Sequence, residues 1–148
     1  MNAQRVDDGK GASGGGAPDG AELRAPVPVS AAAARLQVAE MLHRRFGGSA
    51  GTALGDGVLA DALLVTSELV TNAFRHGGGL TGFIAECGPD GLRLVVADAS
   101  SDPPATTPRP AGQFIGGYGW PLVCRLAKSV AVTPTGTGKR VEAILPLE

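Results

Sequence analysis

The chain has 148 residues, 43% of them hydrophobic, and a formal net charge of −1, which suits one domain with a single core. The near-neutral charge without a clustered basic face argues against nucleic-acid binding, and Cys87 and Cys124 lie outside any zinc-site or disulfide spacing. No run approaches the roughly 18 apolar residues of a membrane span, and the N-terminus lacks the apolar stretch of a secretory signal. These features predict a cytoplasmic protein that does not bind membranes.

The first segment, residues 1–20, is rich in glycine and has little to bury, so we expect a disordered tail before a folded domain over 21–148. Residues 21–29 can hold a short strand, which Pro26 and Pro28 would confine to a sheet edge.

A first helix is predicted over 31–46, with Ser30 as its N-cap and Gly47-Gly48 at its end. Its expected apolar face consists of Leu36, Val38, Met41, Leu42 and Phe46.

A second helix is predicted over 57–76, capped by Asp56 and stopped by Gly77-Gly-Gly79. Two strands follow, over 80–87 and 92–98. The Asp90-Gly91 pair between them is typical of a hairpin turn.

A proline-rich loop over 99–119 precedes a short helix over 120–127, in which Pro121 falls in the first turn. Two last strands, over 128–133 and 139–147, flank a turn. Because helices and strands come in groups, the order indicates an α+β fold, a two-layer sandwich with helices on one face of a mainly antiparallel sheet.

Three polar residues recur along the second predicted helix. Glu68, Asn72 and His76 stand four residues apart, so they form one stripe near its C-terminal end. A carboxamide oxygen is a suitable ligand for Mg²⁺, and a carboxylate can orient or deprotonate a hydroxyl. A solvated polar face explains the same stripe.

Asp98 ends an alternating strand in which Leu92, Leu94 and Val96 share its face. An acid in a core-facing row is unfavourable unless a group donates to it, and an adenine amino group is such a donor. The alternative is an acid that begins the next turn.

Glycines cluster at Gly116-Gly-Tyr-Gly119, just before the short helix. Glycines let backbone N–H groups approach a phosphate, and a helix N-terminus adds a favourable partial charge. A flexible loop is the alternative.

The order of these features resembles the Bergerat-type, histidine-kinase-like ATPases, and more narrowly the bacterial anti-sigma-factor serine/threonine kinases. The run Leu64-Val-Thr-Ser-Glu-Leu-Val-Thr-Asn-Ala-Phe-Arg-His76 is similar to their N-box, which has the form E-L-V-T-N-A-x-x-H. Asp98-Ala-Ser100 with Pro103 resembles the first glycine box. Gly117-Tyr-Gly-Trp-Pro-Leu-Val123 resembles the second glycine box, and Gly138-Lys-Arg-Val141 the terminal G-K-T-V segment.

The resemblance implies roles for individual residues. Glu68 would be the general base, Asn72 would coordinate Mg²⁺ between the phosphates of ATP, and Asp98 would accept from the adenine amine. Loop 101–118 would be a short lid that Gly117 and Gly119 allow to close. The other nucleotide-binding residues implied by the matched motifs are Arg75, His76, Ser100, Pro103, Tyr118, Trp120, Leu122, Val123, Lys139 and Arg140.

Members of the resembled family phosphorylate a serine of an antagonist protein and sequester a sigma factor, and they commonly dimerise. Two positions depart from the family pattern: Arg140 stands where Thr is usual near the adenine pocket, and Glu142 stands where Trp is common. Arg140 would either reach a phosphate or crowd the base. A non-catalytic nucleotide-binding module that acts by sequestration is therefore the alternative function, and a protein–protein scaffold without nucleotide is a third.

Overall fold

The computed structural model describes residues 26–47, 54–104 and 119–148. The expected tail over 1–20 lies outside these residues, as do residues 21–25 of the expected first strand. Residues 26–30 form no strand.

The first helix, α2, spans Ala31–Phe46, as the sequence predicts. The Ser30 hydroxyl accepts a hydrogen bond from the Ala33 N–H at 3.0 Å and so caps one of the unpaired amides of the first turn. Val38 and Leu42 are buried, but Leu36 is 60% exposed, so its place on the predicted apolar face was wrong.

The second helix, α3, spans Asp56–His76. Its N-cap is Gly55, without a side-chain hydrogen bond, so the prediction that Asp56 is the cap was wrong by one residue. Asp56 lies in the first turn, where its negative charge still favours the helix dipole. Gly77 ends the helix, and its N–H donates to the Ala73 carbonyl at 3.1 Å.

The described strands are β1 (Leu80–Gly88), β2 (Gly91–Asp98), β3 (Ser129–Pro134) and β4 (Lys139–Leu145). They form one antiparallel sheet in the order β1-β2-β4-β3. The register pairs Asp98 at the end of β2 with Lys139 at the start of β4. The remaining helix, α4, spans Gly119–Leu126 and precedes β3.

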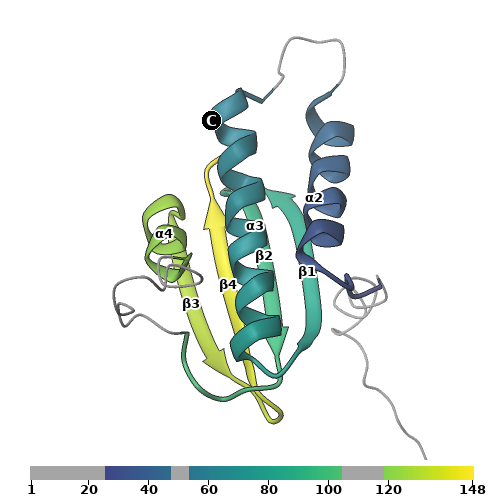
Figure 1. The fold of residues 1–148 in the computed structure, drawn as a ribbon. Coiled ribbons are helices and arrows are strands. Elements are labelled where there is room, and N and C mark those ends of the chain that lie inside the picture. Colours follow the sequence, from purple (N-terminus) through teal and green to yellow (C-terminus); the bar gives the residue numbers. More distant parts are fainter. Residues whose placement is uncertain (1–25, 48–53, 105–118) are drawn as a thin grey trace, which may run out of the picture.

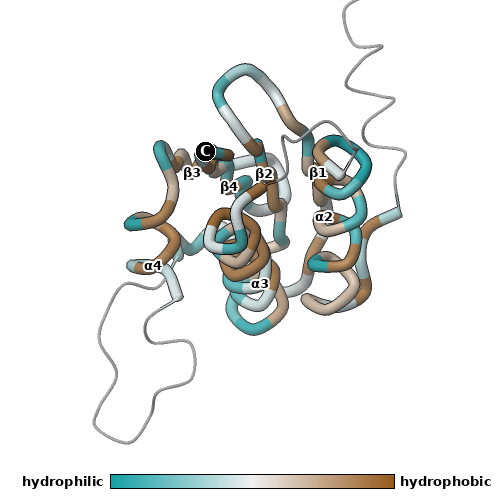
Figure 2. Tube along the Cα trace, turned by 90° about the horizontal axis from the view of Figure 1, so that it is seen from above, coloured by the Kyte–Doolittle hydropathy of each residue, from teal (hydrophilic) through white to brown (hydrophobic). Residues whose placement is uncertain are grey.

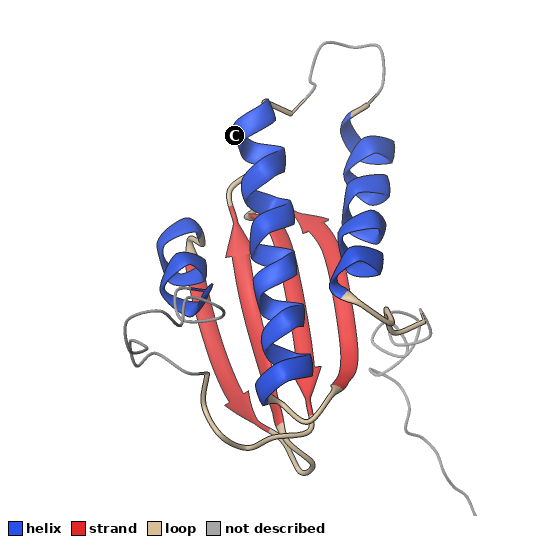
Figure 3. Cartoon of the chain, in the orientation of Figure 1, coloured by secondary structure: helices blue, strands red, loops and turns tan. Residues whose placement is uncertain are grey.

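The helices α2, α3 and α4 lie on one side of the sheet, with α3 across its middle (Figures 1 and 3). Figure 2 shows the same two layers from above. The core between the layers is apolar, and its fully buried side chains include Val38, Leu42, Val65, Val70, Leu92, Leu94, Val96, Val123 and Leu145. This arrangement confirms the predicted α+β sandwich. Among the described helices, α3 alone has a length and hydropathy that would suffice to cross a membrane, and here it packs on the sheet.

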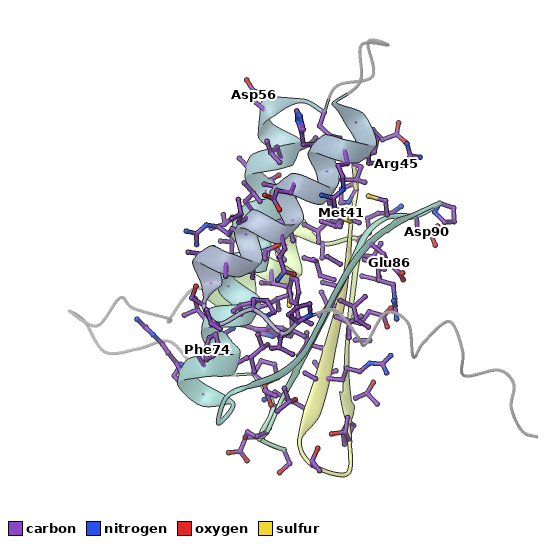
Figure 4. All side chains as sticks on the ribbon, turned by 90° about the vertical axis from the view of Figure 1, so that its right-hand side faces the viewer. Met41, Arg45, Asp56, Phe74, Glu86 and Asp90 are labelled. Carbon is purple, nitrogen blue, oxygen red and sulfur yellow. The ribbon has the colours of Figure 1, made fainter. Side chains whose placement is uncertain are left out.

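The other face of the sheet carries a charged cluster at its centre. The Arg93 guanidinium forms ion pairs with Glu86 on β1 and Glu142 on β4. The hydrogen bond from Arg93 to Glu142 is the main cause that raises the pKa of Arg93. Figure 4 shows Glu86 on the side away from the helices.

Candidate functional site

A small pocket opens where the C-terminal half of α3 meets the paired ends of β2 and β4 and the start of α4. Its wall combines apolar side chains with a few polar groups. The lining residues are Leu69, Asn72, His76, Val96, Asp98, Pro103, Pro104, Trp120, Lys139 and Val141. Segments far apart in sequence thus contribute to one concave site, which is the usual form of a small-molecule site.

The polar stripe of α3 divides between two surroundings. Asn72 and His76 line the pocket. Glu68, one turn earlier, is partly buried and lies against Gly119, where a Cβ would collide with the Glu68 carboxylate. A larger residue at position 119 would force the Glu68 carboxylate to move from its present position. A carboxylate beside the first residue of α4 also favours that helix through its dipole.

Asp98 is only 5% exposed and lies at the pocket's sheet end. Its Oδ1 accepts hydrogen bonds from the Ser100 N–H at 3.0 Å and from Lys139 Nζ at 3.1 Å, and its Oδ2 lies 2.9 Å from Lys139 Nζ. The core-facing position of Asp98 and its turn contact are both observed, and its side-chain donor in the structure is Lys139. Asp98 is a core-facing acid with a donor, and it also closes a turn through the amide two residues later.

The end of α3 is tied directly to Asp98. The Ala99 N–H donates to the Gly77 carbonyl at 2.8 Å, and a Cβ at Gly77 would collide with the Asp98 carboxylate. Only glycine permits this contact, so Gly77 both ends the helix and fixes the distance from the α3 stripe to Asp98. Sequence reasoning treated Gly77 as a stop signal alone and missed this second role.

Lys139, and not Arg140, faces the pocket. Lys139 is 6% exposed, whereas Arg140 is exposed and is paired with Ala97 on the opposite face of the sheet. The expectation that Arg140 reaches or crowds the base is corrected accordingly. The alternation of residues along β4 could have predicted this, because Lys139 lies on the same face as the buried residues Val141, Ala143 and Leu145.

The remaining predicted residues have varied positions. Pro103 and Trp120 line the pocket, and the Ser100 backbone contacts both Asp98 and Lys139. Arg75 is exposed in the last turn of α3 and does not line the pocket, while Leu122 is half-buried and Val123 is fully buried in the core. Gly117 and Tyr118 lie outside the described residues. Leu69, Val96, Pro104 and Val141 line the pocket although the sequence did not single them out.

The chain is similar to known structures and to one family model. Solved structures similar to the chain include two of the Erythrobacter litoralis EL346 blue-light activated histidine kinase. Its histidine kinase domain is 23% identical, with a TM-score of 0.48 over 82% of this chain and 66% of that one. The second has 22% identity and a TM-score of 0.45, over 75% of this chain and 40% of that one.

The chain thus spans less than two thirds of either structure. No curated protein matches it. The sequence model of the histidine kinase-like ATPase domain matches residues 26–145, which is most of the chain. Such a domain implies ATP binding, and the chain belongs to the histidine kinase-like ATPase domain family.

Proposed function

We propose that this protein is an ATP-binding regulator that acts as an anti-sigma-factor-like serine/threonine kinase. It would phosphorylate a serine of an antagonist protein and sequester a sigma factor in the cytoplasm, with a homodimer as its working form. The observation that carries the proposal is the convergence of Asn72, Asp98 and Trp120 on one pocket, with Glu68 beside the first residue of α4.

The sheet end of the pocket suits the base of ATP. Leu69, Val96 and Val141 supply apolar walls, and Asp98 is the acidic acceptor among them. A purine ring buries flat apolar faces but keeps hydrogen-bonding groups on its edge, so it needs this combination of wall and acceptor. Asp98 is already oriented by the Ser100 amide and by Gly77, which lowers the cost of ordering it on binding.

The α3 end of the pocket suits an Mg²⁺ ion that is coordinated partly by the protein and partly by the phosphates of the nucleotide. Among the described residues, no three His, Cys, Asp or Glu side chains gather into a metal site. Asn72 offers a single carboxamide oxygen, and Mg²⁺ bound there would take its other ligands from phosphates and water. When bound, Mg²⁺ supplies charge neutralisation for phosphoryl transfer.

Two variants separate binding from transfer. Asn72→Ala should abolish binding of Mg-ATP in a calorimetric titration. Glu68→Gln keeps the side-chain volume beside Gly119 but removes the base, so it should bind Mg-ATP normally and lose transfer of radiolabelled phosphate to an antagonist protein by about 100-fold or more. Exposed Glu40 on α2 gives the control variant Glu40→Gln. Normal transfer by the Glu68 variant would remove Glu68 from the mechanism.

One observation favours the non-catalytic alternative. Glu68 does not line the pocket, and its contact with Gly119 gives it a structural use. In this second function the nucleotide would order the site so that the chain sequesters a partner without phosphorylating it. Titration with ATP and ADP, with and without Mg²⁺, beside the transfer assay distinguishes the two functions. Binding without transfer by the wild-type chain supports the second.

A further inference from the structure

The pocket contains a buried ion pair between neighbouring strands. Lys139 and Asp98 are directly paired in the sheet register, and their side chains are 7% and 5% exposed. Burying two charges carries a desolvation penalty that their attraction only partly offsets, so such a pair is weak evidence of a stabilising role. A lysine that lines a ligand pocket at this position calls for a functional explanation.

The hydrogen bonds of the pair leave capacity for a ligand. Lys139 Nζ has three hydrogens to donate, and it lies 2.9 Å from Asp98 Oδ2, 3.1 Å from Asp98 Oδ1 and 3.4 Å from the Ser100 carbonyl oxygen. The last distance exceeds the usual range for an N–H···O bond, so that hydrogen is weakly held and can be given to a better acceptor. Asp98 Oδ2, which receives only Lys139 among these contacts, keeps a lone pair for another donor.

We propose that Lys139 reads the base of the nucleotide together with Asp98. The proposal rests on the ATP-binding function proposed above. Asp98 accepts from the exocyclic amine of adenine, and Lys139 Nζ donates to the adjacent ring nitrogen N1. The two side chains thereby offer an acceptor and a donor side by side, which complements the donor–acceptor edge of adenine.

This arrangement also gives a reason for base selectivity. Guanine carries the opposite order on the same edge, with a carbonyl oxygen at position 6 and an N–H at position 1. In the orientation that adenine takes, guanine would set its carbonyl against the Asp98 carboxylate and its N–H against the Lys139 ammonium. A site that leaves buried polar groups unpaired rejects a ligand strongly. Lys139 is therefore a specificity-determining residue for adenine over guanine.

The decisive experiment alters the ligand and leaves the wild-type chain intact. ATP, GTP and 1-deaza-ATP, in which a C–H group replaces N1, are titrated calorimetrically into the full chain at a fixed Mg²⁺ concentration. We expect 1-deaza-ATP and GTP each to bind at least about tenfold more weakly than ATP, because a hydrogen bond to a charged group is lost. Equal affinity for ATP and 1-deaza-ATP would overturn the proposal.

A matched set of variants then assigns the effect to Lys139. Lys139→Met removes the ammonium while keeping a long side chain, so ATP and 1-deaza-ATP should bind it equally. Lys139→Gln retains a neutral donor and should restore part of the preference. Arg140→Met, on the exposed face of the same strand, is the control and should keep the full preference. If Lys139→Met fails to fold, Lys139→Gln and the titrations of the wild-type chain with 1-deaza-ATP and GTP still test the proposal.

Other outcomes are also informative. Tighter ATP binding by Lys139→Met than by the wild type would overturn the proposal, since Lys139 would then compete with the base. Absence of binding by any nucleotide would refute the proposed function and this inference together. ATP binding without dependence on N1 would refute this inference alone.

Discussion

The two cysteines differ in their surroundings. Cys87 at the end of β1 is partly buried, and burial raises the pKa of its thiol, although nearby Arg45 opposes the shift. Cys124 on α4 is exposed. The reactive species is the thiolate, and a raised pKa lowers its fraction at pH 8.

Iodoacetamide at pH 8 should therefore alkylate Cys124 several-fold faster than Cys87, as followed by mass spectrometry of intact and digested protein. The lag of Cys87 should shrink as the pH rises toward its raised pKa, because the thiolate fraction then increases. In 8 M urea the two rates should converge. Equal rates in the folded chain would contradict this assignment.

The position of a side chain was predictable from sequence where it depends only on the periodicity of its own strand or helix. The burial of Asp98 followed from period-two alternation in β2, and the shared stripe of Asn72 and His76 followed from helical spacing. The motif match implied that Lys139 binds nucleotide, but the sequence analysis expected Arg140 to be the residue that reaches into the pocket. Which donor satisfies Asp98 depends on the register between β2 and β4, and no local pattern specifies that register.

Two leucines of α2 test the packing of that helix on the core. Leu42 is 1% exposed and Leu36 is 60% exposed, so they are a matched pair in one element. Leu42→Ala should lower the free energy of unfolding by about 2–5 kcal/mol, because it removes buried methyl groups and leaves a cavity. Leu36→Ala should change it by less than about 0.5 kcal/mol.

Urea denaturation followed by circular dichroism measures both values. A loss at Leu36 as large as that at Leu42 would show that the exposed face of α2 is covered in solution, and it would change the interpretation of this helix.

Element boundaries were largely predictable because turn chemistry marks them. Ser30 caps α2 and Gly77 ends α3. The turn between β1 and β2 consists of Pro89 and Asp90, one residue earlier than the predicted Asp90-Gly91 pair, because Gly91 is already the first residue of β2 and pairs with Gly88. The cap of α3 was misplaced because Asp56 is a better capping residue by type than Gly55. The backbone nevertheless begins the helix one residue earlier, and Asp56 becomes part of the first turn.

The whole molecule provides a direct test of nucleotide binding. A ligand that binds only the folded state stabilises it by about 2.7 kcal/mol at 100 times its Kd. For a domain of this size, that stabilisation raises Tm by roughly 5–10 °C. Mg-ATP should produce such a shift in differential scanning calorimetry, and it should produce none in the Asn72→Ala variant. An unchanged Tm for the wild type at saturating Mg-ATP would count against the site.

The two-layer architecture followed from the grouping of helices and strands, but the pocket did not. Its walls come from α3, β2, β4 and α4. Gly77 approaches Asp98 too closely for any Cβ, and a Cβ at Gly119 would displace the Glu68 carboxylate. These contacts join segments that are distant in sequence, so the sequence identifies the glycines but does not predict which residues they contact.

The charged cluster lies on the face of the sheet that none of the described helices covers, and this has a consequence for self-association. Bare sheets tend to stack on one another through their flat surfaces, as in fibrils. Here a second flat surface pressed onto β2 would remove Arg93, Glu86 and Glu142 from water together, and dehydration of three ions carries a penalty of several kcal/mol. We therefore expect these ion pairs to disfavour stacking of a second sheet on this face, and so to oppose fibril-like growth where none of the described helices covers the sheet.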